Sequence, residues 1–150
     1  ANWLLRHNEV DRALEFALKA YANANEVENQ MILPYVHAVA GSCYAQLKNT
    51  IEALSHFNDG TQLAEKDQDQ RAACYLHLSR ARFELARGET VAARDLLLTG
   101  AAIAKRQNLP LMRKETALAL ADTFEALGQY KAAVDQHKLA WRLEREGRIH

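Results

Sequence analysis

Small residues recur every forty positions along this chain, and this recurrence restricts the possible folds more than any other feature of the sequence. One series of positions spaced by forty holds only alanine, and a second series, seven residues later, holds only alanine or glycine. The members are Ala13, Ala53, Ala93 and Ala133, and then Ala20, Gly60, Gly100 and Ala140. Such a recurrence is typical of a repeat protein, in which each unit is one supersecondary element that packs against its neighbours.

Each forty-residue unit is predicted to form a hairpin of two helices. The turns are expected at a third series of positions, five residues before the first series: Asn8, Lys48, Gly88 and Gly128. Apolar residues recur at helical spacing on both sides of these positions. After the second of these turns they are Ile51, Leu54, Phe57, Gly60 and Leu63. Small residues on the second helix would let its partner approach closely.

The two prolines fit this arrangement. Pro34 and Pro110 lie where first helices are expected to begin. Proline is tolerated at the start of a helix, because the amide hydrogen that it lacks has no partner there in any case. Both residues therefore predict helix starts rather than helix breaks.

The composition agrees with helices and limits the possible partners. Only six Gly and two Pro occur in 150 residues, which excludes turn-rich β folds, and 19 Lys and Arg balance 19 Asp and Glu. Nucleic acids and anionic membranes both bind to concentrated basic surfaces, so neither is expected as a partner. The longest uncharged segment, residues 29–47, contains proline, serine and glutamine and is too polar to span a bilayer.

Sequence signals for export are not found either. The chain shows no basic start followed by an apolar run, and two cysteines cannot form a disulfide framework. A cytoplasmic protein with reduced thiols is therefore expected. Apolar residues 3–5 precede any helix cap and residues 139–149 end without a closing turn, so we also expect the chain to be a piece of a longer protein.

Two of the units carry the same spaced set of small, aromatic and turn residues. In the second unit these residues are His37, Ala40, Gly41, Tyr44, Ala53 and Phe57. In the fourth unit they are Ala117, Leu120, Ala121, Phe124, Gly128, Tyr130 and Ala133. This pattern resembles the tetratricopeptide repeat (TPR).

The resemblance has two departures. The third unit has Arg80, Ala81 and Glu84 at the positions where the family has leucine, glycine and an aromatic residue. TPR units also usually have about 34 residues, so a HEAT or armadillo array, with units of about 40 to 47 residues, is the alternative.

The resemblance implies an all-α fold, a TPR-like helical-hairpin solenoid with a forty-residue period that winds as a right-handed superhelix. The chain would be a single array with units at about residues 1–30, 31–70, 71–110 and 111–150, the first of which lacks the start of its first helix. Stacked hairpins of this kind bury a continuous core and leave a concave surface on which a protein or peptide segment binds.

In TPR proteins, outward positions of each first helix line that concave groove. Carried over to this chain, these positions hold the expected binding residues Arg6, Tyr35, Ser42, Gln46, Tyr75, Arg82, Glu115, Asp122 and Glu125. Positive charge lies early in this series and negative charge late, which suits a peptide with an acidic and a basic end. Exposed helix faces also carry charges for solvation alone, and this alternative stays open.

The sequence holds no motif for catalysis or for a cofactor, so a non-catalytic protein without a cofactor is expected. The chain lacks a P-loop, a dinucleotide-binding glycine motif, a His-Glu-x-x-His pair and a Cys-x-x-Cys pair. The nearest approach to a zinc set is His37, Cys43, Cys74 and His77. The first two are six residues apart and poorly placed for one helix face, so no metal site is predicted.

The last segment, residues 129–150, resembles the final TPR helix of bacterial sensor proteins, above all of GGDEF diguanylate cyclases. The resemblance implies a sensory or regulatory module of a larger signalling protein, with any catalysis in an output domain outside this chain. The alternatives are a peptide-sensing regulator of the Rap type, a TPR arm of a transcription activator, and an architectural dimerisation arm. Because terminal repeats usually need polar caps, we expect homodimers through the terminal helices, with contacts at Leu139, Trp141 and Leu143.

Overall fold

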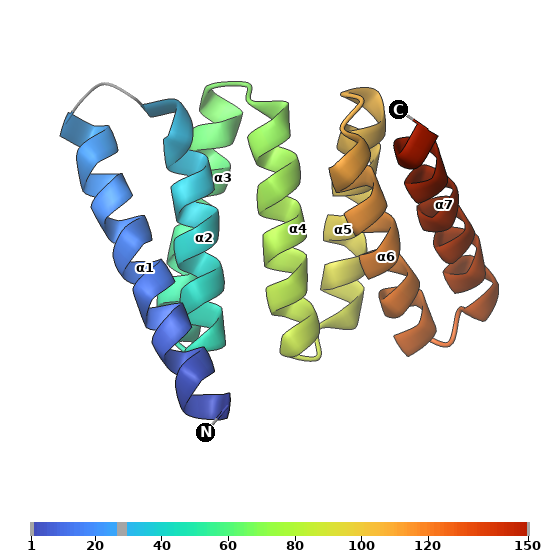
Figure 1. Ribbon diagram of the computed structural model, residues 1–150, viewed down its shortest axis with the longest axis horizontal. Coiled ribbons are helices and arrows are strands. Elements are labelled where there is room, and N and C mark those ends of the chain that lie inside the picture. The colour runs from blue at the N-terminus through green and yellow to red at the C-terminus, as the bar shows by residue number, and fades with distance from the viewer. Residues whose placement is uncertain (1, 27–29, 150) are drawn as a thin grey trace. The chain divides into compact units, whose positions relative to one another are not determined.

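The computed structural model describes residues 2–26 and 30–149, and the side chains of residues 8–23 and 31–147. The described residues form helices joined by short turns, without strands (Figure 1). The helices are α1 (Asn2–Glu26), the 3-10 helix η1 (Gln30–Ile32), α2 (Leu33–Gln46), α3 (Thr50–Lys66), α4 (Gln70–Ala86), α5 (Thr90–Arg106), α6 (Pro110–Ala126) and α7 (Tyr130–Ile149). The expectation of an all-helical chain is thus confirmed. None of these helices, over the residues described, is both long and apolar enough to cross a membrane.

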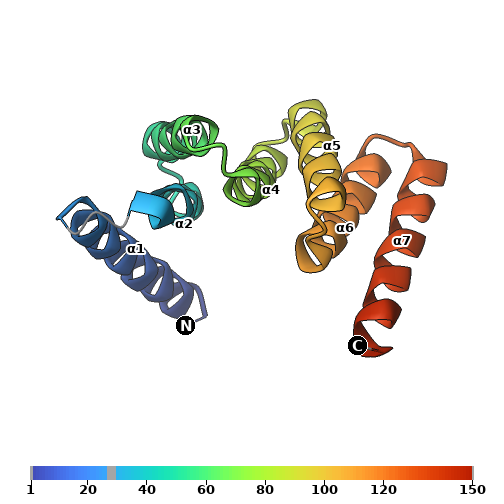
Figure 2. The same ribbon diagram turned by 90° about the horizontal axis from the view of Figure 1, so that it is seen from above.

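The chain divides into two compact bodies, and the boundary falls within α4. The N-terminal body contains residues 1–79 and the C-terminal body residues 80–150. In the N-terminal body, α2 packs between α1 and α3, and in the C-terminal body α6 packs between α5 and α7 (Figures 1 and 2). In each body, therefore, three consecutive helices form a layer whose middle helix packs against a neighbour on both sides.

The turns between consecutive helices from α2 onward share one backbone conformation. Each contains one residue with positive φ: Lys48 (61°), Gln68 (54°), Gly88 (81°), Asn108 (54°) and Gly128 (75°). The residue that follows donates its amide hydrogen to the carbonyl five positions earlier, as Asn49 does to Tyr44 at 2.8 Å. This bond satisfies a carbonyl at the end of the helix and reverses the chain within three residues. The expected turns at Lys48, Gly88 and Gly128 are confirmed.

The fourth expected turn, at Asn8, is not found. Asn8 lies within α1, which runs without interruption from Asn2 to Glu26. The segment around Asn8 contains neither glycine nor proline, so nothing in it terminates a helix. Arg6 therefore belongs to the same helix as Ala13 and Ala20, not to a separate first helix, and its side chain lies outside the described residues.

Helix starts are stabilised by different means along the chain. The Asn49 and Asp69 side chains accept hydrogen bonds from the amides of Glu52 and Ala72, at 3.4 and 3.0 Å, as N-cap residues do. Pro34 is the second residue of α2 and Pro110 the first residue of α6, which confirms the predicted helix starts.

Close helix approach at glycines builds the N-terminal core. A Cβ atom added to Gly60 of α3 would lie 2.8 Å from Leu76 Cδ2, 2.9 Å from His37 Cβ and 3.3 Å from the Pro34 carbonyl oxygen. A Cβ atom on Gly41 of α2 would meet the ring of Phe57 at 2.7 Å. Such contacts leave no room for larger residues at either glycine.

Of the apolar stripe predicted on α3, the first residue does not join the core. Phe57 is fully buried, but Ile51 is 81% exposed. Ile51 lies in the first turn of α3, directly after the chain reversal, where no neighbouring helix covers it. Helical periodicity alone does not reveal this, because it gives the face of a helix but not the length over which a partner covers that face.

In the C-terminal body the core is formed by α5, α6 and α7, together with Ala81 and Phe83 at the end of α4. Leu97, Leu120 and Ala121 are each at most 1% exposed, and Ala133 and Ala140 of α7 are buried as well. The hydroxyl groups of the buried Thr116 and Thr123 donate to the carbonyls of Arg113 and Ala119, at 3.0 and 2.7 Å. These bonds satisfy the hydroxyls within their own helix, so the two threonines can be buried at low cost.

Gly60→Ala tests the close approach. Because the added methyl group would collide with α2 and α4, we expect the free energy of unfolding in urea to fall by about 1–3 kcal/mol. Gly147→Ala is the matched control, since Gly147 also lies in a helix but has open space around it. That substitution should leave stability unchanged or raise it by up to about 1 kcal/mol. Equal losses of stability in both variants would contradict the predicted packing.

Candidate functional site

In the N-terminal body, the predicted binding residues lie on α2 and α4. Tyr35, Ser42 and Gln46 of α2 are spaced by seven and four residues, which places them along one helix face. The rings of Tyr35 and Tyr75 lie side by side, with centroids 5.7 Å apart and planes tilted by 50°. Both rings are half-buried, so each keeps part of its surface for a ligand.

The Tyr35 hydroxyl is held in its neutral form. Burial raises the pKa of Tyr35, and the negative charge of Asp69 raises it further. A neutral phenol both donates and accepts hydrogen bonds. The tyrosine pair can therefore offer flat apolar contacts together with a polar group.

In the C-terminal body, the predicted residues lie on α4 and α6, and two of them form an ion pair. Arg82 Nη2 of α4 is 3.5 Å from Glu115 Oε2 of α6. The two side chains are 58% and 38% exposed, so water screens their attraction, and such pairs contribute about 0–1 kcal/mol. A charged group of a ligand can replace either side chain in the ion pair. While the pair is formed, the charges of Arg82 and Glu115 largely cancel.

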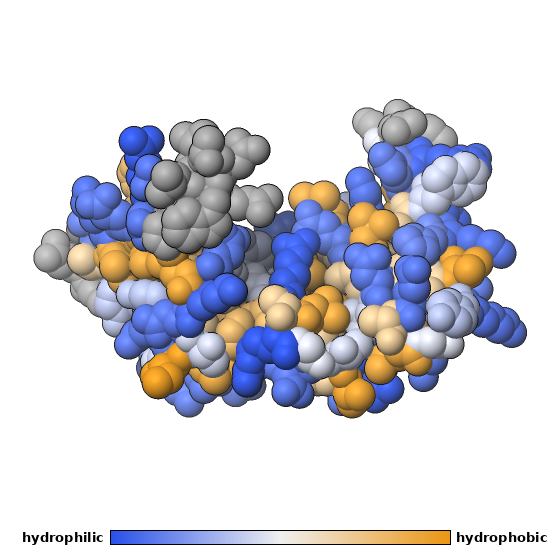
Figure 3. Space-filling model, turned by 90° about the horizontal axis from the view of Figure 1, so that it is seen from below, coloured by the Kyte–Doolittle hydropathy of each residue, from blue (hydrophilic) through white to orange (hydrophobic). Residues whose placement is uncertain are grey.

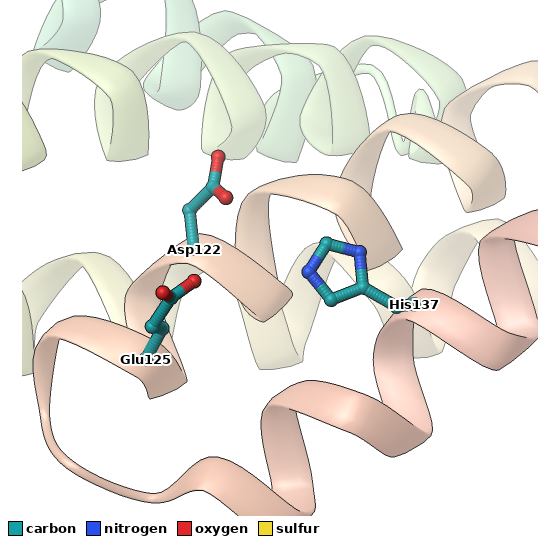
Figure 4. A group of neighbouring side chains, drawn as sticks. All are labelled: Asp122, Glu125 and His137. Atoms are coloured by element: carbon teal, nitrogen blue, oxygen red, sulfur yellow. The ribbon is translucent and has the colours of Figure 1, made fainter.

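Two predicted residues of α6 form a cluster with a histidine that was not foreseen from the sequence. The Asp122 and Glu125 side chains of α6 lie beside His137 of α7, as Figure 4 shows. One ligand atom of each lies within 4.8 Å of the others. Because His137 comes from a different helix, only the packing of α7 on α6 brings it to the two carboxylates. Neither a motif nor a spacing in the sequence signals it.

Carboxylates and imidazoles are ligands for divalent metal ions, but the spacing and exposure of these three side chains do not require a bound ion. Zinc binds its ligands at about 2.0–2.2 Å, so the three side chains would have to draw together around an ion. All three are exposed to solvent. We interpret the cluster as an acidic surface beside an exposed histidine. Among the described residues no other set of three His, Cys, Asp or Glu side chains comes as close.

Histidines and tyrosines also meet inside the N-terminal body. His37 Nδ1 of α2 and His56 Nδ1 of α3 form a 3.0 Å hydrogen bond. The ring of Tyr21 from α1 meets His37 edge-on, with centroids 5.2 Å apart, and Tyr44 stacks on His56 at 5.4 Å. The sequence did not predict these contacts of His37, because helical spacing does not show which side chains meet across helices.

The histidine pair disfavours a positive charge. Burial lowers the pKa of His37, and the neighbouring His56 lowers it further, whereas Asp59 acts in the opposite direction. Since one ring must donate and the other accept across the Nδ1–Nδ1 bond, protonating both rings would break it. The arrangement is therefore stable with neutral imidazoles.

The two cysteines are structural residues of the interior. Cys43 and Cys74 are both buried, with exposed fractions of 7% and 0%. Burial raises the pKa of each thiol. Because the thiolate is the reactive form, neither side chain is suited to act as a nucleophile at neutral pH.

The predicted self-association residues of α7 have different surroundings. Leu139 is half-buried and lines a cavity of about 210 Å³ together with Leu98 and Leu120 of the same body. Leu143 is also half-buried, but Trp141 is 62% exposed, with the Arg145 guanidinium 4.7 Å from its ring centroid. On the face drawn in Figure 3, hydrophobic side chains lie in patches among hydrophilic ones. Trp141 is thus the one of the three that is best placed for a partner.

His37 predicts a specific pH dependence of stability. Its pKa in the folded protein lies below the ordinary value of 6.5, so below that pH the unfolded chain binds more protons. The contribution of His37 to the free energy of unfolding should therefore be complete above about pH 7. It should be lost as the pH drops through 6.5 toward the lowered pKa. Urea titrations at pH 7.5 and 5.0 measure this difference. The difference between the two pH values should be smaller in His37→Asn. It should persist in the control His137→Asn, because the His137 side chain is exposed.

Comparison with known proteins gives no relative to set beside this site. No protein-family model matches the chain. No match is found among curated proteins or among solved structures either. The resemblance to TPR arrays therefore depends on the residues of this chain alone.

Proposed function

We propose that this chain is a non-catalytic TPR-like module that binds a protein or peptide segment. The observation that carries the proposal is the contrast between two sets of positions. From α3 onward, the small residues of the two forty-residue series are buried between helices. The binding residues expected on α2, α4 and α6, from Tyr35 to Glu125, remain partly or fully exposed.

The helix boundaries support the assignment to repeats. The second helices of the proposed hairpins, α3, α5 and α7, begin at residues 50, 90 and 130. The first helices α4 and α6 begin at residues 70 and 110. A solenoid of hairpins with a forty-residue period accounts for this spacing, and for the small residues that recur with it.

The chemistry of the exposed positions suggests the kind of ligand. Tyr35 and Tyr75 suit apolar or planar groups of a peptide. Among the predicted binding residues of the C-terminal body, Arg82 pairs with Glu115, so Asp122 and Glu125 supply the remaining charges of that set. A segment with an apolar part and a basic part fits these two surfaces better than one with a strongly acidic part.

Within a larger protein, such a module would be the sensory or regulatory part of a cytoplasmic bacterial signalling protein, in the manner of TPR regions attached to diguanylate cyclases. A peptide-sensing regulator or a transcription-activator arm would use the same surface. The exposed Trp141 favours a second candidate function, an architectural arm that dimerises through α7 without a groove ligand.

Neutralising the acidic surface tests the peptide-binding function. Peptides selected from a random dodecamer library against the intact chain should be enriched in Lys and Arg. Their affinity, measured by fluorescence anisotropy, should fall about three- to tenfold in Asp122→Asn/Glu125→Gln, because two attractive charges are lost. The melting temperature should not change, since both side chains are exposed.

The matched control removes two acidic charges elsewhere in the same body. Asp135 and Glu146 are exposed on α7, and eleven residues separate them, so they share a helix face that does not include His137. Asp135→Asn/Glu146→Gln should leave peptide affinity unchanged. An equal loss of affinity in both double variants would show a general effect of net charge and would contradict the assigned surface. Failure to select any peptide would favour the architectural arm.

Trp141→Ala tests that second candidate. If α7 dimerises the chain, sedimentation equilibrium should show dimers at high micromolar concentration, and the substitution should weaken association at least tenfold, as loss of a central tryptophan does at interfaces. Ile51→Ala is the control, because Ile51 is 81% exposed but belongs to α3 rather than to α7. A strict monomer in the unsubstituted protein would rule out this mode of association.

A further inference from the structure

An apolar groove lies between α1 and α2, which run side by side in both ribbon views (Figures 1 and 2). It encloses about 510 Å³. Its sides include Ala13, Ala17 and Ala20 of α1, Ile32 of η1, and Val36 and Val39 of α2. Phe16 also lines the groove and is 75% exposed. The described side chains that line it are apolar except for the hydroxyl of Tyr35.

The groove becomes informative when its residues are compared with those forty positions later. Ala13, Ala17 and Ala20 correspond to Ala53, Phe57 and Gly60 of α3, and these three are buried. Ile32, Val36 and Val39 correspond to Ala72, Leu76 and Ser79 of α4, which are 0%, 2% and 7% exposed. In the groove itself, Ile32 and Val39 are 39% and 37% exposed. Ala13, Ile32 and Val39 are thus exposed where Ala53, Ala72 and Ser79 are buried, whereas Ala17 is buried in the groove as well.

The equivalent residues of α3 and α4 are covered by a helix. The contacts of Gly60 are Leu76 of α4 on one side and Pro34 and His37 of α2 on the other. One helical turn further along α2, Gly41 lies against the ring of Phe57. The groove between α3 and α4 is therefore filled by α2, which contributes the Pro34 carbonyl, the His37 Cβ and Gly41 at the closest points.

We propose that the groove between α1 and α2 binds an α-helix of a partner chain, in the way that the groove between α3 and α4 holds α2. This surface differs from the exposed face proposed above for a peptide, although Tyr35 borders both. The occupant is an apolar helix whose contact face is mostly small. Apolar helices in grooves are a common mode of recognition, and the buried area supplies the affinity.

The groove also specifies one side chain of its occupant. Where α3 has Phe57 opposite Gly41, α1 has Ala17, so the wall of the groove lacks a phenyl ring. A helix that fills it must supply a large apolar residue at the position equivalent to Gly41. Neither α2 nor α7 of a second copy offers such a face. α2 already lies against α3, and the exposed face of α7 presents Tyr130 and Trp141, two large residues eleven positions apart.

The test uses two stapled peptides with the sequence of residues 31–49, which contains α2. A hydrocarbon staple joins the positions of Val39 and Gln46, both exposed in the structure, and keeps the short helix folded. One peptide retains glycine at position 41 and the other carries G41F. By isothermal titration against the intact chain, the G41F peptide should bind at least tenfold more tightly. In Ala17→Phe, which restores the ring to the wall, this preference should be reversed.

A second pair of variants keeps the proposal testable if Ala17→Phe does not fold. Phe16→Asp places a charge in the groove and should weaken the G41F peptide at least tenfold. Leu18→Asp is the control, because Leu18 is 43% exposed on α1 but does not line the groove. Circular dichroism establishes that both variants are folded.

Three results would overturn the proposal. One is that neither peptide binds, or that both bind equally. Another is that Leu18→Asp weakens binding as much as Phe16→Asp does. The third is a dimer of the unsubstituted chain that Phe16→Asp dissociates in the absence of peptide, which would make a second copy the occupant.

Discussion

The close approach of helices at glycine and alanine is the constraint on which the rest of the N-terminal body depends. At Gly60, three groups from two other helices lie within 3.3 Å of the place that a Cβ atom would take. This approach brings His37 and His56 into hydrogen-bonding distance and presses Gly41 onto Phe57. Larger residues would push the helices apart and break these contacts together, since a packed interior transmits such displacements.

The same positions have different surroundings along the chain, and this difference gives the structure its functional interest. Ala53 and Ala93 are completely buried, whereas Ala13 is exposed beside an apolar groove. A repeat unit buries its small face only where the neighbouring helix is present. The open face at α1 is therefore the natural place for another helix, whereas the charged face of α6 is suited to polar contacts.

Electrostatics separates the interior from the surface. Three titratable groups of the interior, His37 and the two cysteine thiols, have pKa values shifted toward their neutral forms by burial, whereas the buried Glu84 pairs with Arg87 at 3.4 Å. The charged pair of Arg82 and Glu115 and the cluster around Asp122 lie on the surface, where water screens them. Binding through these groups can change without disturbing the core.

The sequence by itself determined the helical class, the turns at Lys48, Gly88 and Gly128, and the helix starts at Pro34 and Pro110. These features depend on local backbone preferences and on periodicity, which a sequence displays directly. Only the tertiary structure decided that Asn8 continues a helix, that Ile51 is exposed, and that His37 meets His56 while His137 meets Asp122. Those outcomes depend on which helix covers which face and at what distance, and such distances between segments are not encoded in any local pattern.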